Sequence, residues 1–241
     1  MPFGAGALGH VEAVMRILDA APSIGALEGS VAPVLVVPAV FEPELCRRLI
    51  GYHESTGGKP SGFMTERQGR TVERMDDDFK RRYDCLVEDE ALGNACAERI
   101  RRRLVPLIAR VFQFKATRME RHLVACYDGA EKGRFRAHRD DTTKGTAHRR
   151  FAVSLFLNTG EYSGGELRFP EFGARRYSAP AGGAAVFSCT LLHEALPVLE
   201  GRRYMFLPFL YDEAAARVRE RNAHFLESQA RDYKAFPQDG R

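Results

Sequence analysis

Two residues near the middle of the chain have the types and spacing of metal ligands. His138 and Asp140 lie two positions apart. If this segment is a β-strand, alternate side chains point to the same face, so the imidazole and the carboxylate would project together. Asp141 would point to the opposite face and is the poorer candidate. The pattern alone is common, so a functional interpretation needs a third ligand and a structural context.

His193 is the third candidate ligand. It follows Asp140 by 53 residues and lies in a late segment of strand character, after several glycine-marked turns. A closed sheet could bring this segment next to the one that holds His138. Two imidazoles and one carboxylate on one side of a metal form the facial triad of non-haem Fe(II) oxygenases, which leaves coordination positions open. The three residues therefore predict a catalytic iron site.

The other histidines have simpler interpretations. His148 either faces the mouth of a pocket or lies in an exposed turn, and the exposed turn is the commoner case. His122 alternates with apolar residues and is expected in the core or on a sheet face. His10, His53 and His224 have no companions that could share a metal.

The composition is that of an ordinary globular protein. The chain has 241 residues, of which 44% are hydrophobic and 28% charged, and a formal net charge of +4. These values exclude disorder, collagen and a coiled coil as descriptions of the whole. The longest apolar run, residues 31–41, is too short for a membrane span. The N-terminus lacks a signal-peptide pattern, so we expect a cytoplasmic protein. The five cysteines form no C-x-x-C pair, which argues against a disulfide framework or a zinc ribbon.

The first half of the chain predicts helices and loops. Residues 1–30 are expected to be a weakly ordered arm. Residues 31–116 are expected to be a helical support region, with one helix that begins at Pro43 and a later one that is kinked or restarted at Pro106. Residues 57–82 are polar and contain glycines, and we expect an irregular or mobile stretch there, either a lid or a solvated loop.

From residue 117 the hydrophobic period changes to two and short segments are separated by glycine turns. The predicted strand segments are 119–127, 134–140, 150–158, 165–170, 174–178, 184–189, 193–199 and 202–211. Eight such segments predict a jelly-roll or cupin-like barrel, a double-stranded β-helix, over residues 117–212. A helix from Glu213 to Gln229 is expected within the C-terminal segment 213–241. The predicted fold class is mainly β with flanking helices.

Positive charge is concentrated in two places. Residues 134–150 hold six Lys or Arg and two Asp, a local charge of +4. If this cluster rims a pocket, it favours an acidic or phosphate-bearing substrate, although part of it can simply offset Asp140 and Asp141. The helix that contains Arg99 and Arg101–Arg103 is expected to present a solvated face. A nucleic-acid stripe is less favoured because no aromatic residues interleave with these arginines.

A longer pattern surrounds the candidate ligands. It consists of ACYDG (125–129), RAHRD (136–140), LFLN (155–158), GGEL (164–167) and PAGGAAVFS (180–188), followed by His193, Pro197–Val198, Gly201 and Arg203. In order and spacing these segments resemble the 2-oxoglutarate and Fe(II)-dependent dioxygenases, within them the prolyl 4-hydroxylase-like branch. The resemblance covers about residues 117–212.

The resemblance implies roles for individual residues. His138, Asp140 and His193 would hold Fe(II). Arg203 would grip the distal carboxylate of 2-oxoglutarate, a task that suits a guanidinium because it is always charged and binds carboxylates through two hydrogen bonds. Strand alternation would turn Arg202 to the opposite face.

Two further residues are implied at the cosubstrate pocket. Tyr127 matches a tyrosine that lines this pocket, although a core tyrosine would look the same. In some relatives a second tyrosine bonds the cosubstrate, but Phe156 stands at the matching position here. Because of this difference, either Arg203 binds the cosubstrate without the second tyrosine, or the Ser154 hydroxyl makes the hydrogen bond instead.

The predicted function is that of a dioxygenase that hydroxylates a C–H bond of a protein side chain or amino-acid-like substrate, with release of succinate and CO2. The resemblance implies Fe(II), 2-oxoglutarate and O2, with ascorbate as the reductant that restores the iron. The expected partner is a small-molecule, peptide or protein substrate, with no membrane; the oligomeric state is open. The alternatives are a non-catalytic 2-oxoglutarate or metal sensor of the same fold, and a nucleic-acid demethylase.

Overall fold

The computed structural model of the chain describes residues 9, 30–227 and 235–237. The arm expected over residues 1–30 lies almost entirely outside the described residues, as do the last two residues of the predicted C-terminal helix. In the part that is described, no helix combines the length and the apolar character that a membrane crossing requires.

The helices lie mainly in the first half of the chain. In the described chain the α-helices are α2 (Pro43–Thr56), α3 (Glu90–Arg99), α4 (Val105–Phe112) and α5 (Glu213–Asn222), with a π-helix at Ile100–Leu104 and 3-10 turns at Gly129–Glu131, Pro170–Phe172 and Ala223–Phe225. As predicted, Pro43 stands at the start of α2. The interruption predicted at Pro106 is present as the π-helix, in which the Val105 N–H bonds to Ile100 O. Proline disturbs the normal ladder here because it lacks an N–H and its ring crowds the preceding turn.

The strands form two principal sheets. Their bounds are β1 Leu35–Val37, β2 Lys59–Pro60, β3 Phe63–Arg67, β4 Arg70–Arg74, β5 Lys80–Arg81, β6 Tyr83–Leu86, β7 Arg118–Glu120, β8 Leu123–Asp128, β9 Arg134–His138, β10 Phe151–Phe156, β11 Ser163–Gly164, β12 Leu167–Arg168, β13 Arg176–Tyr177, β14 Ala184–Ser188, β15 His193–Ala195, β16 Val198–Glu200, β17 Arg202–Phe206, β18 Phe209–Tyr211 and β19 Ala235–Pro237. The larger sheet runs β19-β7-β18-β10-β17-β8-β6-β2, with β14 beside β10 and β1 beside β14. The smaller runs β13-β12-β15-β9-β5, and β11-β16 and β3-β4 are separate pairs.

Three predicted segments are each split into two strands. Between β7 and β8, Arg121 adopts a left-handed backbone conformation (φ 64°) that ends the ladder. Pro197 separates β15 from β16, and Pro208 separates β17 from β18, because proline has no N–H to donate to a neighbouring strand. The splits leave the predicted order of segments intact.

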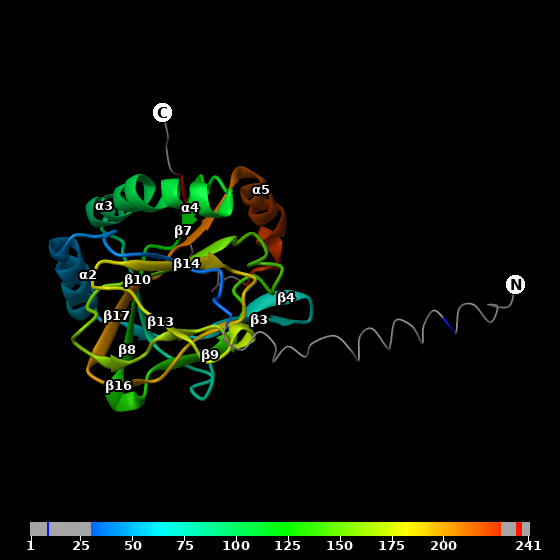
Figure 1. Cartoon of the computed structure of the whole chain (residues 1–241). Helices are drawn as coiled ribbons and strands as arrows, with labels where there is room; N and C mark the ends of the chain where they lie inside the picture. Colours follow the sequence, from blue (N-terminus) through cyan, green and yellow to red (C-terminus); the bar gives the residue numbers. More distant parts are fainter. Residues whose placement is uncertain (1–8, 10–29, 228–234, 238–241) are drawn as a thin grey trace, which may run out of the picture.

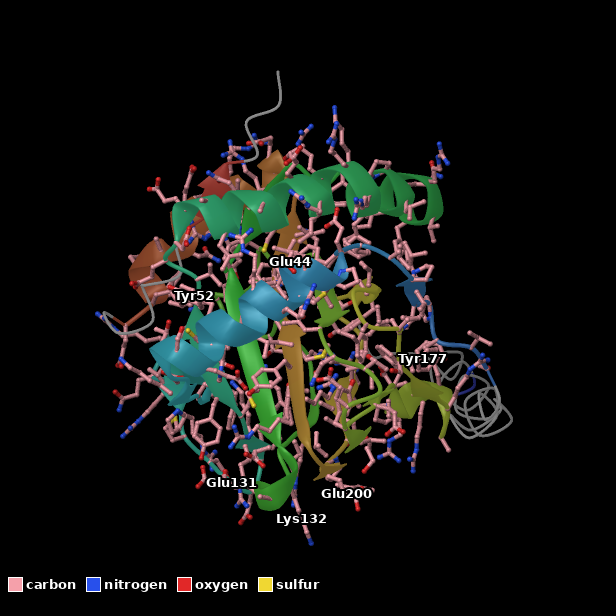
Figure 2. The ribbon with its side chains drawn as sticks, turned by 90° about the vertical axis from the view of Figure 1, so that its left-hand side faces the viewer. Glu44, Tyr52, Glu131, Lys132, Tyr177 and Glu200 are labelled. Atoms are coloured by element: carbon pink, nitrogen blue, oxygen red, sulfur yellow. The ribbon has the colours of Figure 1, made fainter. Side chains whose placement is uncertain are left out.

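The larger sheet separates two hydrophobic clusters. On β8, Val124 and Cys126 point into a cluster with α2, α3 and α4, whereas Ala125 and Tyr127 point into a cluster shared with the smaller sheet. Figure 1 shows α3 and α4 along one edge of the molecule, and Figure 2 shows α2 laid across β8 and β17. The chain thus forms a jelly-roll core with helices on the outer face of one sheet, as predicted.

The expectation of an irregular stretch over residues 57–82 is wrong. This segment contains the β3-β4 hairpin and joins both sheets through β2 and β5. Thr71 in β4 is fully buried, and its hydroxyl accepts a hydrogen bond from the Gly145 N–H at 2.9 Å. Its carbonyl accepts from the Glu227 N–H at 3.2 Å, beside a bridge to Leu226. Docking to two distant segments gives this polar stretch its order.

The same contact explains why the C-terminal helix is shorter than predicted. The α5 helix begins after Asp212, whose side chain accepts from the Ala215 N–H at 2.8 Å. It ends at Asn222 rather than at Gln229. Leu226 is needed in an extended conformation for its bridge to Thr71. Tertiary pairing therefore ends the helix where the local sequence would allow it to continue.

Candidate active site

The three predicted metal ligands come together at one edge of the smaller sheet. His138 ends β9, His193 begins β15, and the two are paired across these antiparallel strands. The strand ends at His138, so Asp140 lies in the following bend, where its N–H donates to Cys189 O at 3.0 Å. The Asp140 carboxylate lies 3.6 Å from His138 Nε2 and 3.4 Å from His193 Nε2. Among the described residues, these are the three whose potential ligand atoms converge within 4.8 Å of one another.

Backbone carbonyls orient both imidazole rings. Nδ1 of His138 lies 2.7 Å from Arg136 O, and Nδ1 of His193 lies 3.0 Å from Leu191 O. Because a carbonyl only accepts, each Nδ1 must carry the proton and donate it. The lone pair of each ring is then on Nε2, the atom that faces Asp140. This is the tautomer that a metal-binding histidine uses.

The protonation states also suit metal binding. Burial, followed by the charge of His138, lowers the pKa of His193 to about 4, so its imidazole is neutral at pH 7. Burial acts to raise the pKa of Asp140, but the nearby His193, His138 and Arg149 outweigh it and hold that pKa well below its usual range. The site therefore offers a carboxylate and a neutral His193 imidazole to a metal.

A buried ion-pair network contacts the backbone of Asp140. Arg149 donates from Nε to Glu120 at 2.7 Å and from Nη1 to the Asp140 carbonyl at 3.4 Å. His148 donates to the other Glu120 oxygen at 2.7 Å, and Arg219 lies 3.5 Å from it. His148 is only 2% exposed, so both predicted placements, the pocket mouth and an exposed turn, are wrong. Its burial is explained by the hydrogen bond that it donates to the buried Glu120 carboxylate.

Arg203 is buried on the inner face of β17, and Arg202 is exposed, as strand alternation predicts. Arg202 bonds to Asp128 at 2.9 Å. Arg203 is 1% exposed, and its Nε and Nη2 have no hydrogen-bond partner. Its guanidinium lies 4.9 Å from the ring centre of Tyr127 and 5.3 Å from that of Phe156. Buried polar groups are rarely left unpaired, so these two N–H groups fit an anion that binds beside them.

Gly165 provides space for Arg203. A Cβ atom at this position would lie 2.8 Å from Arg203 Cδ, and the residue has φ 71°. The sequence indicated only a turn role for this glycine. The structure adds a packing role next to the buried guanidinium.

A cavity of about 490 Å³ opens beside the candidate ligands. Tyr127 lines it from β8 and Ser154 from β10, and Arg82 donates to the Tyr127 hydroxyl at 3.3 Å. Phe156 is fully buried in the core cluster and does not line the cavity. Arg203 is not among the lining residues either, so its contact with the cavity runs through the Tyr127 ring.

The basic cluster over residues 134–150 does not form one rim. Arg134 bonds to the carbonyls of Asp77 and Asp78, and Arg139 bonds to Glu171 at 2.8 Å. Arg139 and Arg149 line the cavity, and Arg149 is the member that offsets Asp140. The cluster is therefore divided among separate carboxylates and carbonyls.

Sequence reasoning missed a charged wall of the cavity. Lys80 and Arg82 line it from the segment that was expected to be irregular, together with Arg121. Arg82 forms two hydrogen bonds of 2.6 Å with Asp84. A signal was present, because Lys80, Arg82 and Asp84 are spaced two apart, the period of a strand face.

The chain was compared with known proteins. Residues 122–211 match the model of the 2OG-Fe(II) oxygenase superfamily. The match covers 90 of the 241 residues and most of the barrel. No curated protein sequence matches the chain. The matched segment contains His138, Asp140 and His193, and the name of the superfamily denotes oxygenases that use Fe(II) and 2-oxoglutarate. The two imidazoles and the carboxylate fit such an iron, since they leave coordination positions open.

Similar solved structures are prolyl hydroxylases. A Pseudomonas putida prolyl-4-hydroxylase aligns with TM-score 0.58 and 18% identity, covering 79% of this chain and 100% of its own. A Trichoplax adhaerens prolyl hydroxylase, in complex with a hypoxia inducible factor peptide fragment, aligns with TM-score 0.60 and 13% identity over 90% of this chain and 97% of its own. A viral collagen prolyl hydroxylase from Paramecium Bursaria Chlorella virus-1 aligns with TM-score 0.52 and 15% identity over 74% and 94%. At these identities the likeness shows the fold alone.

Among the described residues, the histidines without predicted metal partners are not part of the cluster of candidate ligands. His53 is buried, with its Nε2 3.3 Å from Tyr83 O, and His224 is exposed. His10 lies outside the described residues. His122 is buried in the core, as predicted, and burial lowers its pKa to about 4.

The buried His122 makes stability depend on pH. Its folded pKa lies below the ordinary value of about 6.5, so the unfolded chain binds its proton first, and stability falls as pH drops from about 6.5 towards 4. We expect His122 to account for about 2 kcal/mol of lost stability between pH 7 and pH 5. Urea unfolding of the wild type and His122→Gln at both pH values measures this. An equal loss in the variant would show that other groups cause the dependence.

Proposed function

We propose that the protein is an Fe(II)- and 2-oxoglutarate-dependent hydroxylase that acts on a C–H bond of a protein side chain or amino-acid-like substrate. The observation that carries this proposal is the convergence of His138, Asp140 and His193 within one barrel. The buried Arg203, with two unpaired N–H groups, adds the partner that a dicarboxylate requires. A domain that only bound metal would not need this second feature.

Each residue has a defined task in this proposal. His138 and His193 would hold Fe(II) through Nε2, and Asp140 through its carboxylate. Arg203 would hold the distal carboxylate of 2-oxoglutarate, with Tyr127 beside it and the Ser154 hydroxyl in place of the missing tyrosine. Arg149 and Glu120 keep Asp140 in place. The bound iron supplies the oxidising chemistry that converts 2-oxoglutarate and O2 into succinate, CO2 and a hydroxylated product.

A peptide or amino-acid substrate is favoured by the similar structures, one of which contains a peptide. Ascorbate as the reductant remains a prediction. A nucleic-acid substrate gains no support from the helix arginines: Arg99 and Arg103 pair with Glu42, and Arg102 pairs with Glu98. These pairs match the solvated helix face that the sequence predicts.

The metal site is tested by Asp140→Ala and His193→Ala. Either change removes one of three ligands, so Fe(II) affinity should fall by more than the roughly 10–100-fold typical of losing an outer-shell partner. Succinate formation should stop while circular dichroism stays that of a folded barrel. Anaerobic Fe(II) titration measures the affinity, with Asp141→Ala as the neighbouring control. Full activity in either ligand variant would contradict the assignment.

The cosubstrate site is tested by comparing Arg203 with Arg202. Removing one partner of a buried charge pair costs about 3–5 kcal/mol, which is roughly two to four orders of magnitude in affinity. Arg203→Ala should therefore raise the 2-oxoglutarate requirement at least about a hundredfold without changing Fe(II) affinity. Arg203→Lys should recover part of the loss. Arg202→Ala should change it by less than about tenfold, as for an exposed charge. The reverse order would refute the predicted anchor.

The lid proposal concerns residues 57–82, of which Gly62–Glu66 line the cavity. We expect this segment to close further when cosubstrate and substrate bind, since a closed site excludes water. Trypsin cleavage at the exposed Arg67 and Arg70 should slow with Fe(II) and 2-oxoglutarate present. Cleavage at the exposed helix residues Arg101 and Arg102 serves as the control. Unchanged cleavage at the hairpin with a true substrate also bound would rule out a lid.

A further inference from the structure

We propose that Lys80, with Arg82 and Arg121, binds an anionic group of the substrate, a carboxylate or a phosphate ester. This inference rests on the proposed function and narrows its substrate class. All three cations line the cavity. They do not belong to the candidate metal ligands, and they differ from Arg203, which is not among the lining residues. We call these three residues the cation wall.

Among the described residues, the Lys80 side chain makes a single hydrogen bond. It is 5% exposed, and its ammonium donates to the Gly62 carbonyl. The nearest carboxylate oxygen, Oδ2 of Asp84, is 3.9 Å away, which is too long for a hydrogen bond. An ammonium has three N–H donors, so Lys80 retains donors for a ligand.

Arg82, rather than Lys80, forms the close ion pair with the Asp84 carboxylate. Its Nε and Nη2 each donate to one oxygen of Asp84 at 2.6 Å. Both oxygens of Asp84 are therefore hydrogen-bonded to Arg82. Asp84 interacts with Lys80 only through its charge, at a distance too long for a hydrogen bond. The pair fixes the position of Arg82, whose remaining Nη1 bonds to Tyr127.

The cation wall has an excess of positive charge. Lys80 and Arg82 share one buried carboxylate, Asp84, as their salt-bridge partner. Burial lowers the pKa of Lys80 well below its usual range, and the charges of Arg82 and Arg121 add to this effect. Keeping such a group charged away from water is costly unless an anion compensates it. A ligand anion would supply that compensation.

The cation wall adjoins the candidate metal centre through one aromatic ring. The imidazole of His138 stacks on Phe135 with ring centres 3.5 Å apart. The Lys80 ammonium lies 5.1 Å, and the Arg82 guanidinium carbon 5.8 Å, from the centre of the same Phe135 ring. A substrate anchored by its anion at the cation wall therefore extends along Phe135 towards the metal ligands.

The neighbouring surface suits the carbon chain of such a substrate. Phe63 and Phe79 lie with ring centres 4.4 Å apart, and Phe79 lies 5.8 Å from Phe135. This apolar face continues from the cations along the cavity. The volume of about 490 Å³ is within the range of pockets that bind small molecules. An acidic or phosphorylated amino-acid side chain matches both the apolar face and the charge.

Binding of matched ligand pairs tests the proposal. The probes are N-acetyl amides of glutamate and glutamine, aspartate and asparagine, and phosphoserine and serine. Calorimetric titration uses the full chain under anaerobic conditions, with Fe(II) and 2-oxoglutarate and again without them. At least one acid should bind at least about tenfold more tightly than its neutral partner. The carboxylate and phosphate arms identify which anion the cation wall prefers.

Variants assign the preference to the cation wall. Lys80→Met should abolish the preference, Lys80→Arg should retain most of it, and Lys59→Met, at an exposed lysine of β2, should leave it unchanged. If Lys80→Met does not fold, Arg121→Gln serves in its place and should weaken the preference. The 2-oxoglutarate affinity of each variant should stay within about threefold of the wild type.

Two results would overturn the inference. One is that no acid binds more tightly than its neutral partner. The other is that Lys80→Met weakens 2-oxoglutarate binding as strongly as Arg203→Ala, which would place Lys80 at the cosubstrate. Failure of the proposed function is a separate result. In that case the protein would not bind Fe(II) and 2-oxoglutarate, but it would still bind the acids more tightly than their neutral partners in the titration without them.

Discussion

The antiparallel pairing of β9 with β15 is the interaction on which the candidate site depends. It sets His193 opposite His138, although 55 residues separate them in the chain. The Asp140 N–H continues this connection by bonding to Cys189 O, just before β15. Because side chains alternate along a strand, a slip of one residue would turn an imidazole away from the cavity. The packing of the smaller sheet against the inner face of the larger one fixes the register, so the core and the site form together.

Buried charges around the cavity fall into two groups. Arg82 with Asp84, and Arg149 with Glu120, have partners at 2.6–2.7 Å and act as rigid parts of the frame. Arg203 and Lys80 are equally buried but lack comparable partners among the described residues. A folded chain tolerates such groups only where something else satisfies them. Lys80 lines the cavity, and Arg203 adjoins it through the ring of Tyr127, so each is placed beside the space that an anionic ligand could enter.

Much of the barrel could be predicted because it follows from the two-residue period of the hydrophobic residues. The candidate metal ligands could be predicted from their residue types and their spacing along the chain. Alternation correctly placed Arg203 inside and Arg202 outside. The same reasoning failed where a distant partner decides the conformation. His148 is buried because its ring donates a hydrogen bond to Glu120, 28 positions earlier. The β3-β4 hairpin is ordered because Thr71 docks on Gly145 and Leu226, and no pattern within residues 57–82 reveals those contacts. Lys80 was missed because its segment was not interpreted as a strand.

The docking of Thr71 links three segments that are far apart in the sequence. It joins the hairpin at the cavity, the loop that follows Asp140 and the extended residues after α5. Moving the hairpin away from the cavity would break its bonds to Gly145 and Glu227 at the same moment. Opening of the hairpin and release of the chain after α5 would therefore be one cooperative event with a shared free energy. Backbone amides in these segments would then exchange with solvent deuterium at a common rate, and anything that tightens the chain after α5 would hold the hairpin in place.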